Sequence, residues 1–190
     1  MKAAAALFLF VPTMMLAGCR ISAPEDPNQA MAQMVKYGQK GKPEVAIKVA
    51  EDWLSKHPNE TAHKSALYEQ MAITYLIWAS KDNARREELV GNAAIYYERE
   101  ILERQERPVD LTFYNAGRGF ENAGDLSTVN RCVYYGRAVR AFEKEAPYIQ
   151  GESYTAYGKT IPLAPVRGEN EKSLERVKSK YETAGCKAWP

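Results

Sequence analysis

Residues 41–59 read GKPEVAIKVAEDWLSKHPN, and this stretch decides the fold. Ala46, Ala50 and Trp53 recur at intervals of four and three residues, so their side chains share one face of an α-helix. A glycine and a proline precede this pattern and a second proline follows it, and both residue types interrupt helices. We therefore expect one amphipathic helix with a defined beginning and end.

The same helical spacing continues from Asn28 to Glu145, with almost none of the alternation that strands show. Residues 71–79 are apolar nearly all round, which predicts a central helix that is buried on most sides. Breakers interrupt the pattern at intervals, at Gly38, Pro58, Pro108, Gly124 and Pro147. The spacing between these breakers prompts a search for internal repeats.

Two pairs of segments repeat along this helical region. IYYEREI at residues 95–101 and VYYGRAV at residues 133–139 match in the spacing of their apolar residues, and their starts lie 38 residues apart. Upstream of them, residues 68–75 and 113–120 match each other as candidate first helices of a pair. A period of roughly 20 to 50 residues is typical of repeat architectures such as stacked helix pairs.

At these residues the chain resembles the tetratricopeptide-repeat (TPR) family, whose repeat of about 34 residues is a helix-turn-helix with small residues at the helix crossing. Residues 41–59 follow the family's second helix, and residues 113–125 follow its first helix and turn. The resemblance implies an all-α fold, a right-handed stack of about three helix-turn-helix repeats over residues 28–146. An unrelated helical bundle is the alternative, and it is also all-α.

The chain departs from the TPR pattern at three places. Met34 stands where a small residue is expected, and the turn at residues 80–88 is enlarged. The third repeat runs about two residues long before Tyr134.

The chain changes character after the repeats. Residues 147–168 are rich in Tyr, Gly and Pro and are expected to form a long loop. Residues 169–190 then carry Leu174, Val177 and Tyr181 at helical spacing. This spacing predicts a C-terminal helix and tail that cap the exposed end of the stack.

The N-terminus, MKAAAALFLFVPTMMLAGCR, has the three-part pattern of a secretory signal peptide. Lys2 precedes an apolar run that ends at Gly18 and contains Pro12. This run is shorter than the roughly 20 residues that a membrane-spanning helix needs. We expect residues 1–18 to be absent from the mature protein.

Leu16-Ala17-Gly18-Cys19 resembles the lipobox of bacterial lipoproteins. The resemblance implies a thioether-linked diacylglycerol and a fatty acyl group on Cys19, and no other cofactor. Residues 19–27 would then be a polar, proline-containing tether between the membrane and the domain. Because Arg20 rather than Asp follows the cysteine, the family's sorting rule implies the outer membrane, with the domain facing the periplasm. The alternatives are an ordinary signal peptide with a chance cysteine and an uncleaved anchor.

Composition and motifs argue against several classes of function. The formal net charge is +2 and no long basic stretch is present, so nothing favours a nucleic acid as a partner. His57 and His63 lack the spacing of metal ligands, and no metal is predicted. Since no nucleophile elbow or dinucleotide-binding glycine motif occurs in the sequence, we do not expect an enzyme.

Cys132 and Cys186 are an even pair in a chain that a signal peptide would send to an oxidising compartment. A disulfide between them is one interpretation. The other is that Cys132 is a small buried residue of a helical core. The sequence alone leaves both open.

The TPR resemblance implies a scaffold, because the first helices of such repeats line a concave face that binds a protein or peptide segment. In a lipid-anchored protein this partner would belong to cell-envelope assembly or secretion. The groove positions carried over from the family are Glu69, Ile73 and Ile77, with Ala66 and Leu76, from the second repeat, and Tyr114, Arg118, Glu121 and Asn122 from the third.

The two sets of groove residues differ in character. The apolar second-repeat set is equally consistent with burial under the C-terminal helix, so Tyr114, Arg118 and Asn122 are the stronger candidates. A rival hypothesis is an envelope lipoprotein that binds a small ligand or glycan in a cavity beside Tyr148, Tyr154 and Tyr157, with residues 148–168 as a lid. An envelope hydrolase whose site leaves no motif is a second rival.

Overall fold

The computed structural model describes residues 22–61, 63–103, 111–156 and 159–187. Helices make up most of these residues, so the predicted all-α class is confirmed. The α-helices are α1 (Pro27–Gln39), α2 (Pro43–Lys56), α3 (Lys64–Ala79), α4 (Arg86–Leu102), α5 (Thr112–Leu126), α6 (Arg131–Glu145) and α7 (Leu163–Thr183).

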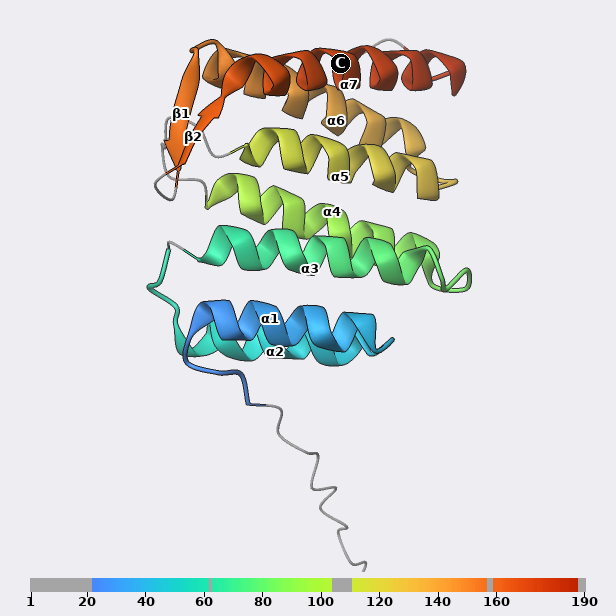
Figure 1. The fold of residues 1–190 in the computed structure, drawn as a ribbon. Coiled ribbons are helices and arrows are strands. Elements are labelled where there is room, and N and C mark those ends of the chain that lie inside the picture. Colours follow the sequence, from blue (N-terminus) through green and yellow to red (C-terminus); the bar gives the residue numbers. More distant parts are fainter. Residues whose placement is uncertain (1–21, 62, 104–110, 157–158, 188–190) are drawn as a thin grey trace, which may run out of the picture.

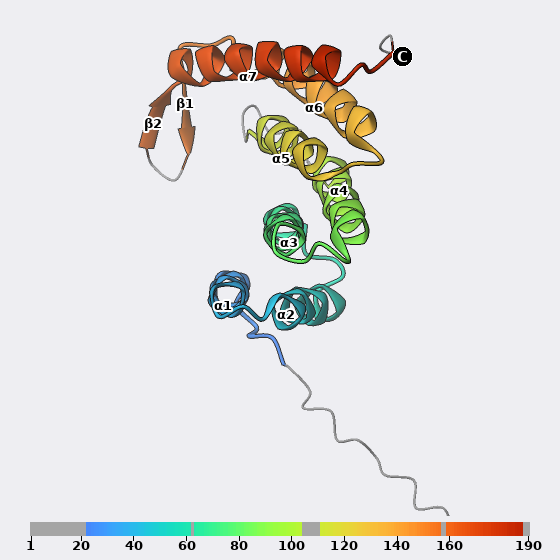
Figure 2. The same ribbon diagram turned by 90° about the vertical axis from the view of Figure 1, so that its right-hand side faces the viewer.

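The first six helices form three pairs, in each of which the second helix packs back on the first. The pairs α1–α2, α3–α4 and α5–α6 stack one on another, and α7 lies along the last pair (Figure 1). In the turned view, α1, α3 and α5 lie along one side of the stack and α2, α4 and α6 along the other (Figure 2). The helices α1, α3 and α5 therefore share one face, which we call the first-helix face.

Local signals explain where the first two helices begin and end. The Asp26 carboxylate accepts a hydrogen bond from the Asn28 backbone N–H at 2.8 Å, which caps α1. Prolines occupy the first position of both α1 and α2, where no backbone N–H is needed. α2 ends at Lys56, just before Pro58, so the helix predicted from residues 41–59 is confirmed.

Glycines on α5 allow the neighbouring helices to approach closely. A Cβ placed on Gly117 would lie 2.7 Å from the Phe142 ring of α6. A Cβ on Gly119 would overlap the Tyr97 ring of α4, and one on Gly124 would overlap the Tyr135 ring of α6. The small residues at the helix crossings are therefore required by packing, as the repeat pattern predicts.

Among the described residues, two hydrophobic clusters make up the core, and α3 contributes to both. The first cluster joins α1, α2 and α3 around the fully buried Met34, Trp53 and Met71. The second extends from α3 to α7 and includes Phe142 and Val177. Met34, which breaks the small-residue pattern, thus fills the core between the first helices.

Residues 147–168 are not the long loop that their composition predicts. They contain part of a short 3₁₀ helix, η1 (Ala146–Ile149), and the strands β1 (Ser153–Ala156) and β2 (Lys159–Pro162). The strands pair antiparallel, with Ser153 opposite Pro162 and Tyr154 opposite Ile161. α7 begins at Leu163 rather than at Glu169, because a proline such as Pro165 is tolerated in the first turn of a helix.

α7 closes the stack, as predicted for the C-terminal helix. Val177 is fully buried, and Leu174 and Tyr181 pack at the edge of the same cluster. The Asn170 side chain donates to the backbone oxygen of Phe142 at 3.0 Å. A disulfide joins Cys132 at the start of α6 to Cys186 just after α7, with the two Cα atoms 5.5 Å apart. The disulfide interpretation is therefore confirmed.

Candidate functional site

The residues predicted on the α3 part of the first-helix face are largely accessible. Ile77 is 50% exposed, Glu69 and Ile73 are half-buried and Ala66 is exposed, whereas Leu76 is buried. α7 packs on α5 and α6 at the far end of the stack from α1 (Figure 1). The interpretation that α7 buries the second-repeat set is therefore wrong.

Glu121 on α5 is covered instead. Its carboxylate accepts two hydrogen bonds from the Arg176 guanidinium, both at 2.7 Å, and its Oε1 lies 2.8 Å from Lys180 Nζ. Burial alone would raise the pKa of Glu121, but the hydrogen bonds and charges of Arg176 and Lys180 outweigh it and lower the pKa. The prediction that Glu121 lies open in a groove is wrong, because α7 occupies this part of the face.

Tyr114 also has a packing role that the sequence did not indicate. Its ring lies 5.8 Å from the Phe142 ring, centroid to centroid, and it packs against the second core cluster. The expectation of a free aromatic anchor is therefore wrong for Tyr114. Arg118 and Asn122 are exposed on α5, and their role in binding stays a prediction.

A pocket of about 920 Å³ lies between α1, α3 and the turns that follow these two helices. We call it the α1–α3 pocket. Its apolar lining comes from Met34 and Val35 of α1 and from Ile77 and Trp78 of α3. Val35 and Ile77 are 40% and 50% exposed, so the pocket presents apolar surface to solvent. Of the predicted groove residues, Ile77 lines this pocket.

Two glycines leave the space that the pocket occupies. Gly38 and Gly41 line it, and a Cβ placed on either would meet no atom within 4 Å. Gly41 also has φ of +69°, in the left-handed region that glycine adopts most easily, which lets the chain turn sharply between α1 and α2.

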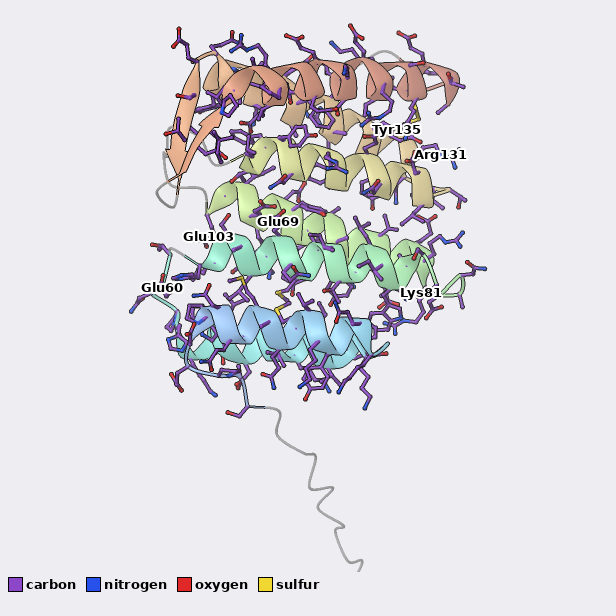
Figure 3. All side chains as sticks on the ribbon, in the orientation of Figure 1. Glu60, Glu69, Lys81, Glu103, Arg131 and Tyr135 are labelled. Carbon is purple, nitrogen blue, oxygen red and sulfur yellow. A yellow bond between two sulfur atoms is a disulfide. The ribbon has the colours of Figure 1, made fainter. Side chains whose placement is uncertain are left out.

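The enlarged turn after α3 forms the other wall of the pocket, at the end of α3 that Lys81 marks in Figure 3. The Arg85 guanidinium lies over the Trp78 ring, 4.7 Å from its centroid, and donates two hydrogen bonds to Glu88. The Asp82 carboxylate accepts from the Arg85 backbone N–H at 3.1 Å. These contacts hold the turn, so this wall is preformed.

The polar groups of the pocket are amides and charges of both signs. Gln39 and Gln70 contribute side-chain amides, each of which can donate and accept hydrogen bonds. Glu44, Asp82 and Lys81 also line it. Because these charges are mixed, shape and apolar contact rather than net charge would select an occupant.

The hairpin lies at the other end of the helices from the pocket. β1 and β2 project beside the start of α5, whereas Lys81 and its turn lie at the opposite end of the helix axes (Figures 1 and 3). Tyr148 packs against Phe113, with the ring centroids 5.9 Å apart. Tyr157 lies outside the described residues. The described parts of residues 148–168 are therefore not placed to act as a lid on the α1–α3 pocket, and a ligand cavity beside Tyr148, Tyr154 and Tyr157 stays a prediction.

Sequence reasoning missed the contribution of α1 to this site, notably Val35 and Gln39. Two signals pointed there, the glycines at and just after the end of α1 and the enlarged turn at residues 80–88. Neither signal by itself indicates a site, because the pocket forms only where the two turns come together.

In the described ranges, no group of three or more His, Cys, Asp or Glu side chains is placed to hold a metal ion. Over the same part of the chain, no helix has the length and apolarity needed to cross a membrane. Cys19 and the predicted signal peptide lie outside the described residues. Comparison of the chain with known protein families, curated proteins and solved structures finds no match.

Proposed function

We propose that the protein is a lipid-anchored scaffold of the cell envelope that binds a segment of a partner protein in assembly or secretion. The lipobox-like Leu16-Ala17-Gly18-Cys19 supports a lipid on Cys19, and Arg20 supports the outer membrane with the domain facing the periplasm. The disulfide between Cys132 and Cys186 fits an oxidising compartment.

A TPR-like, right-handed stack is the arrangement that we propose for the helix pairs. Three observations support it: three successive pairs, first helices that share a face, and glycines at the close crossings. Repeat stacks of this kind commonly bind peptide segments on the face of their first helices.

The α1–α3 pocket is the observation that carries the binding proposal. Its exposed Val35 and Ile77 form an apolar floor, and an apolar side chain placed there would remove both from water. The amides of Gln39 and Gln70 can both donate to and accept from a peptide backbone. We therefore propose that the α1–α3 pocket binds a protein segment that inserts an apolar side chain.

A photo-crosslinking residue at Ile77, in the full-length protein in its own cells, tests this proposal. We expect crosslinking to one segment of one protein, identified by mass spectrometry. Gly38→Leu, which adds a side chain at a position lining the pocket, should abolish the crosslink. The matched control is Gly168→Leu in α7, where an added Cβ also meets no atom within 4 Å, and it should leave the crosslink unchanged.

Other outcomes would overturn the peptide proposal. A crosslink that survives Gly38→Leu would place the partner elsewhere, and a crosslink gained only from position Asn122 would favour the α5 surface.

A small-ligand carrier is the second candidate, because a volume of about 920 Å³ also lies within the range of small-molecule sites. A bound molecule of defined mass in native mass spectrometry, displaced by Gly38→Leu, would favour the carrier.

A further inference from the structure

The segment that precedes α1 is docked on α2 rather than free. The Ala23 backbone N–H donates to the Asp52 carboxylate at 2.7 Å, and Lys56 Nζ donates to Ser22 Oγ at 3.1 Å. Asp52 and Lys56 also form an ion pair at 2.8 Å. The expected tether of residues 19–27 is therefore fixed to the helices from Ser22 onward.

The docked segment is anchored on the core as well as on surface charges. Ala23 is buried and belongs to the first hydrophobic cluster. The Trp53 indole N–H donates to the backbone oxygen of Glu25 at 3.0 Å, and Trp53 itself is almost fully buried. Asp26 then caps α1. The chain from Ser22 to Asp26 is thus part of the folded domain.

This docking limits how far the domain can stand from residue 19. Four residue steps separate Cys19 from Ala23, and a fully extended chain spans at most about 3.6 Å per residue, so the reach is about 14 Å. A tether that stayed free up to Pro27 would reach about 29 Å by the same rule. The contacts with Asp52, Trp53 and Lys56 therefore halve the available length.

We propose that residues 22–26 hold the domain against the membrane surface, with the end of α2 near Asp52–Lys56 facing the bilayer and α7 on the distal side. This inference rests on the lipid anchor at Cys19 proposed above. In Figure 1 the docked segment passes beneath α1 and α2, while α7 forms the opposite side of the stack. Neighbouring packed helices lie about 8 to 10 Å apart, so the successive layers place α7 well beyond the first pair.

The placement also constrains the partner. The α1–α3 pocket lies at the other end of α1 from the docked segment, and the 13 residues of α1 span about 20 Å. The pocket then lies within about 35 Å of the membrane surface. A partner must therefore reach to within this distance of the membrane surface to place a segment in the pocket.

Energy transfer to labelled lipid tests the orientation. The full-length chain, processed and lipidated in cells, is reconstituted into vesicles of phosphatidylethanolamine and phosphatidylglycerol that contain a headgroup-labelled acceptor. A donor dye is attached at Asn59→Cys, after α2, or at Glu175→Cys on α7, both exposed positions. We expect clearly more efficient transfer from position 59 than from position 175.

A flexible insertion provides the matched comparison. Twenty Gly/Ser residues placed between Ile21 and Ser22 add a root-mean-square length of about 25 Å and should remove most of the difference between the two dyes.

The docking contact itself can be tested by hydrogen exchange. Asp52→Ala should speed amide exchange at Ala23 by roughly tenfold or more, because a hydrogen bond to a charged acceptor is lost. Glu51→Ala, at the neighbouring exposed acidic residue, should leave that exchange unchanged.

The outcomes separate the two proposals. If the protein carries lipid by mass spectrometry but the two dyes transfer equally, the orientation is wrong and the anchor stands. If the mature chain carries no lipid and does not sediment with vesicles, the anchor is wrong and the membrane placement falls with it.

Discussion

The α3 and α5 parts of the first-helix face occupy corresponding positions in successive helix pairs, yet α7 packs on some of the α5 part, whereas the α3 part borders the α1–α3 pocket. On α3, Ile77 is half exposed and lines the α1–α3 pocket. On α5, Glu121 is buried and bound by Arg176 and Lys180 of α7. Repeat register predicts which side chains point to a shared face, but the next element along the stack decides whether they remain accessible.

The covering of α5 depends on contacts that the α3 region does not share. The disulfide fixes the end of α7 to α6, and Lys180 also contacts Asp125 of α5 at 2.7 Å. Removing these contacts one at a time should destabilise the packing of α7 on α5 and leave the structure of the α1–α3 pocket unchanged.

Loss of the disulfide should have the largest effect. Cys132→Ser with Cys186→Ser removes a bridge across 54 residues, and the chain-entropy estimate for such a loop is about 4 kcal/mol of unfolding free energy. Urea denaturation measures the loss, and hydrogen exchange should show it concentrated in α6 and α7. Equal loss of protection in α1 and α2 would contradict the idea that the two regions are stabilised separately.

Gly117→Leu should have the next largest effect, because a side chain there collides with Phe142. Overpacking of this kind costs about 3 kcal/mol at the upper end of its usual range. Gly38→Leu on α1, where the space is open, should leave the unfolding free energy unchanged or raise it by up to about 1 kcal/mol. Similar midpoints for the two variants in urea would show that α5 does not cross α6 as closely as described.

Glu121→Gln should have the smallest of the three effects, about 2 kcal/mol, because hydrogen bonds to a charged acceptor are weakened. The folded-state pKa of Glu121 is lowered, so its contribution is present above the unfolded pKa of about 4.3 and is lost as the pH falls through the folded value. The difference between wild type and variant should therefore shrink in acid.

Urea titrations at neutral and acidic pH measure that difference. Glu175→Gln on the exposed side of α7 is the control and should change little at either pH. A Glu121→Gln effect that does not vary with pH would mean that the ionised carboxylate contributes nothing to holding α7.

The helices could be predicted because each carries its own periodic signal. Ala46, Ala50 and Trp53 determine α2 almost alone, and all three are buried as expected. The hairpin could not be predicted in the same way, since strands of four residues are too short to show alternation among glycines and prolines.

The candidate site was harder to predict than the fold because it depends on contacts between distant segments. Ile77 was placed correctly on the first-helix face, but the pocket also needs Val35 and the space beside Gly38. Glu121 was placed on the same face, yet its ion pairs come from a helix 55 residues further along the chain. Docking of Ala23 on Asp52 likewise leaves no local pattern in the sequence.

The position of the α1–α3 pocket gives it a thermodynamic consequence. It lies at the junction between the two hydrophobic clusters, where α2 and α3 pack less extensively than α4 and α5 do. An occupant that requires α1 and α3 to stay together stabilises this junction by RT ln(1 + [L]/Kd), or about 2.7 kcal/mol at a hundredfold excess over Kd. Partner binding and the integrity of the first helix pair are therefore linked equilibria, and each strengthens the other.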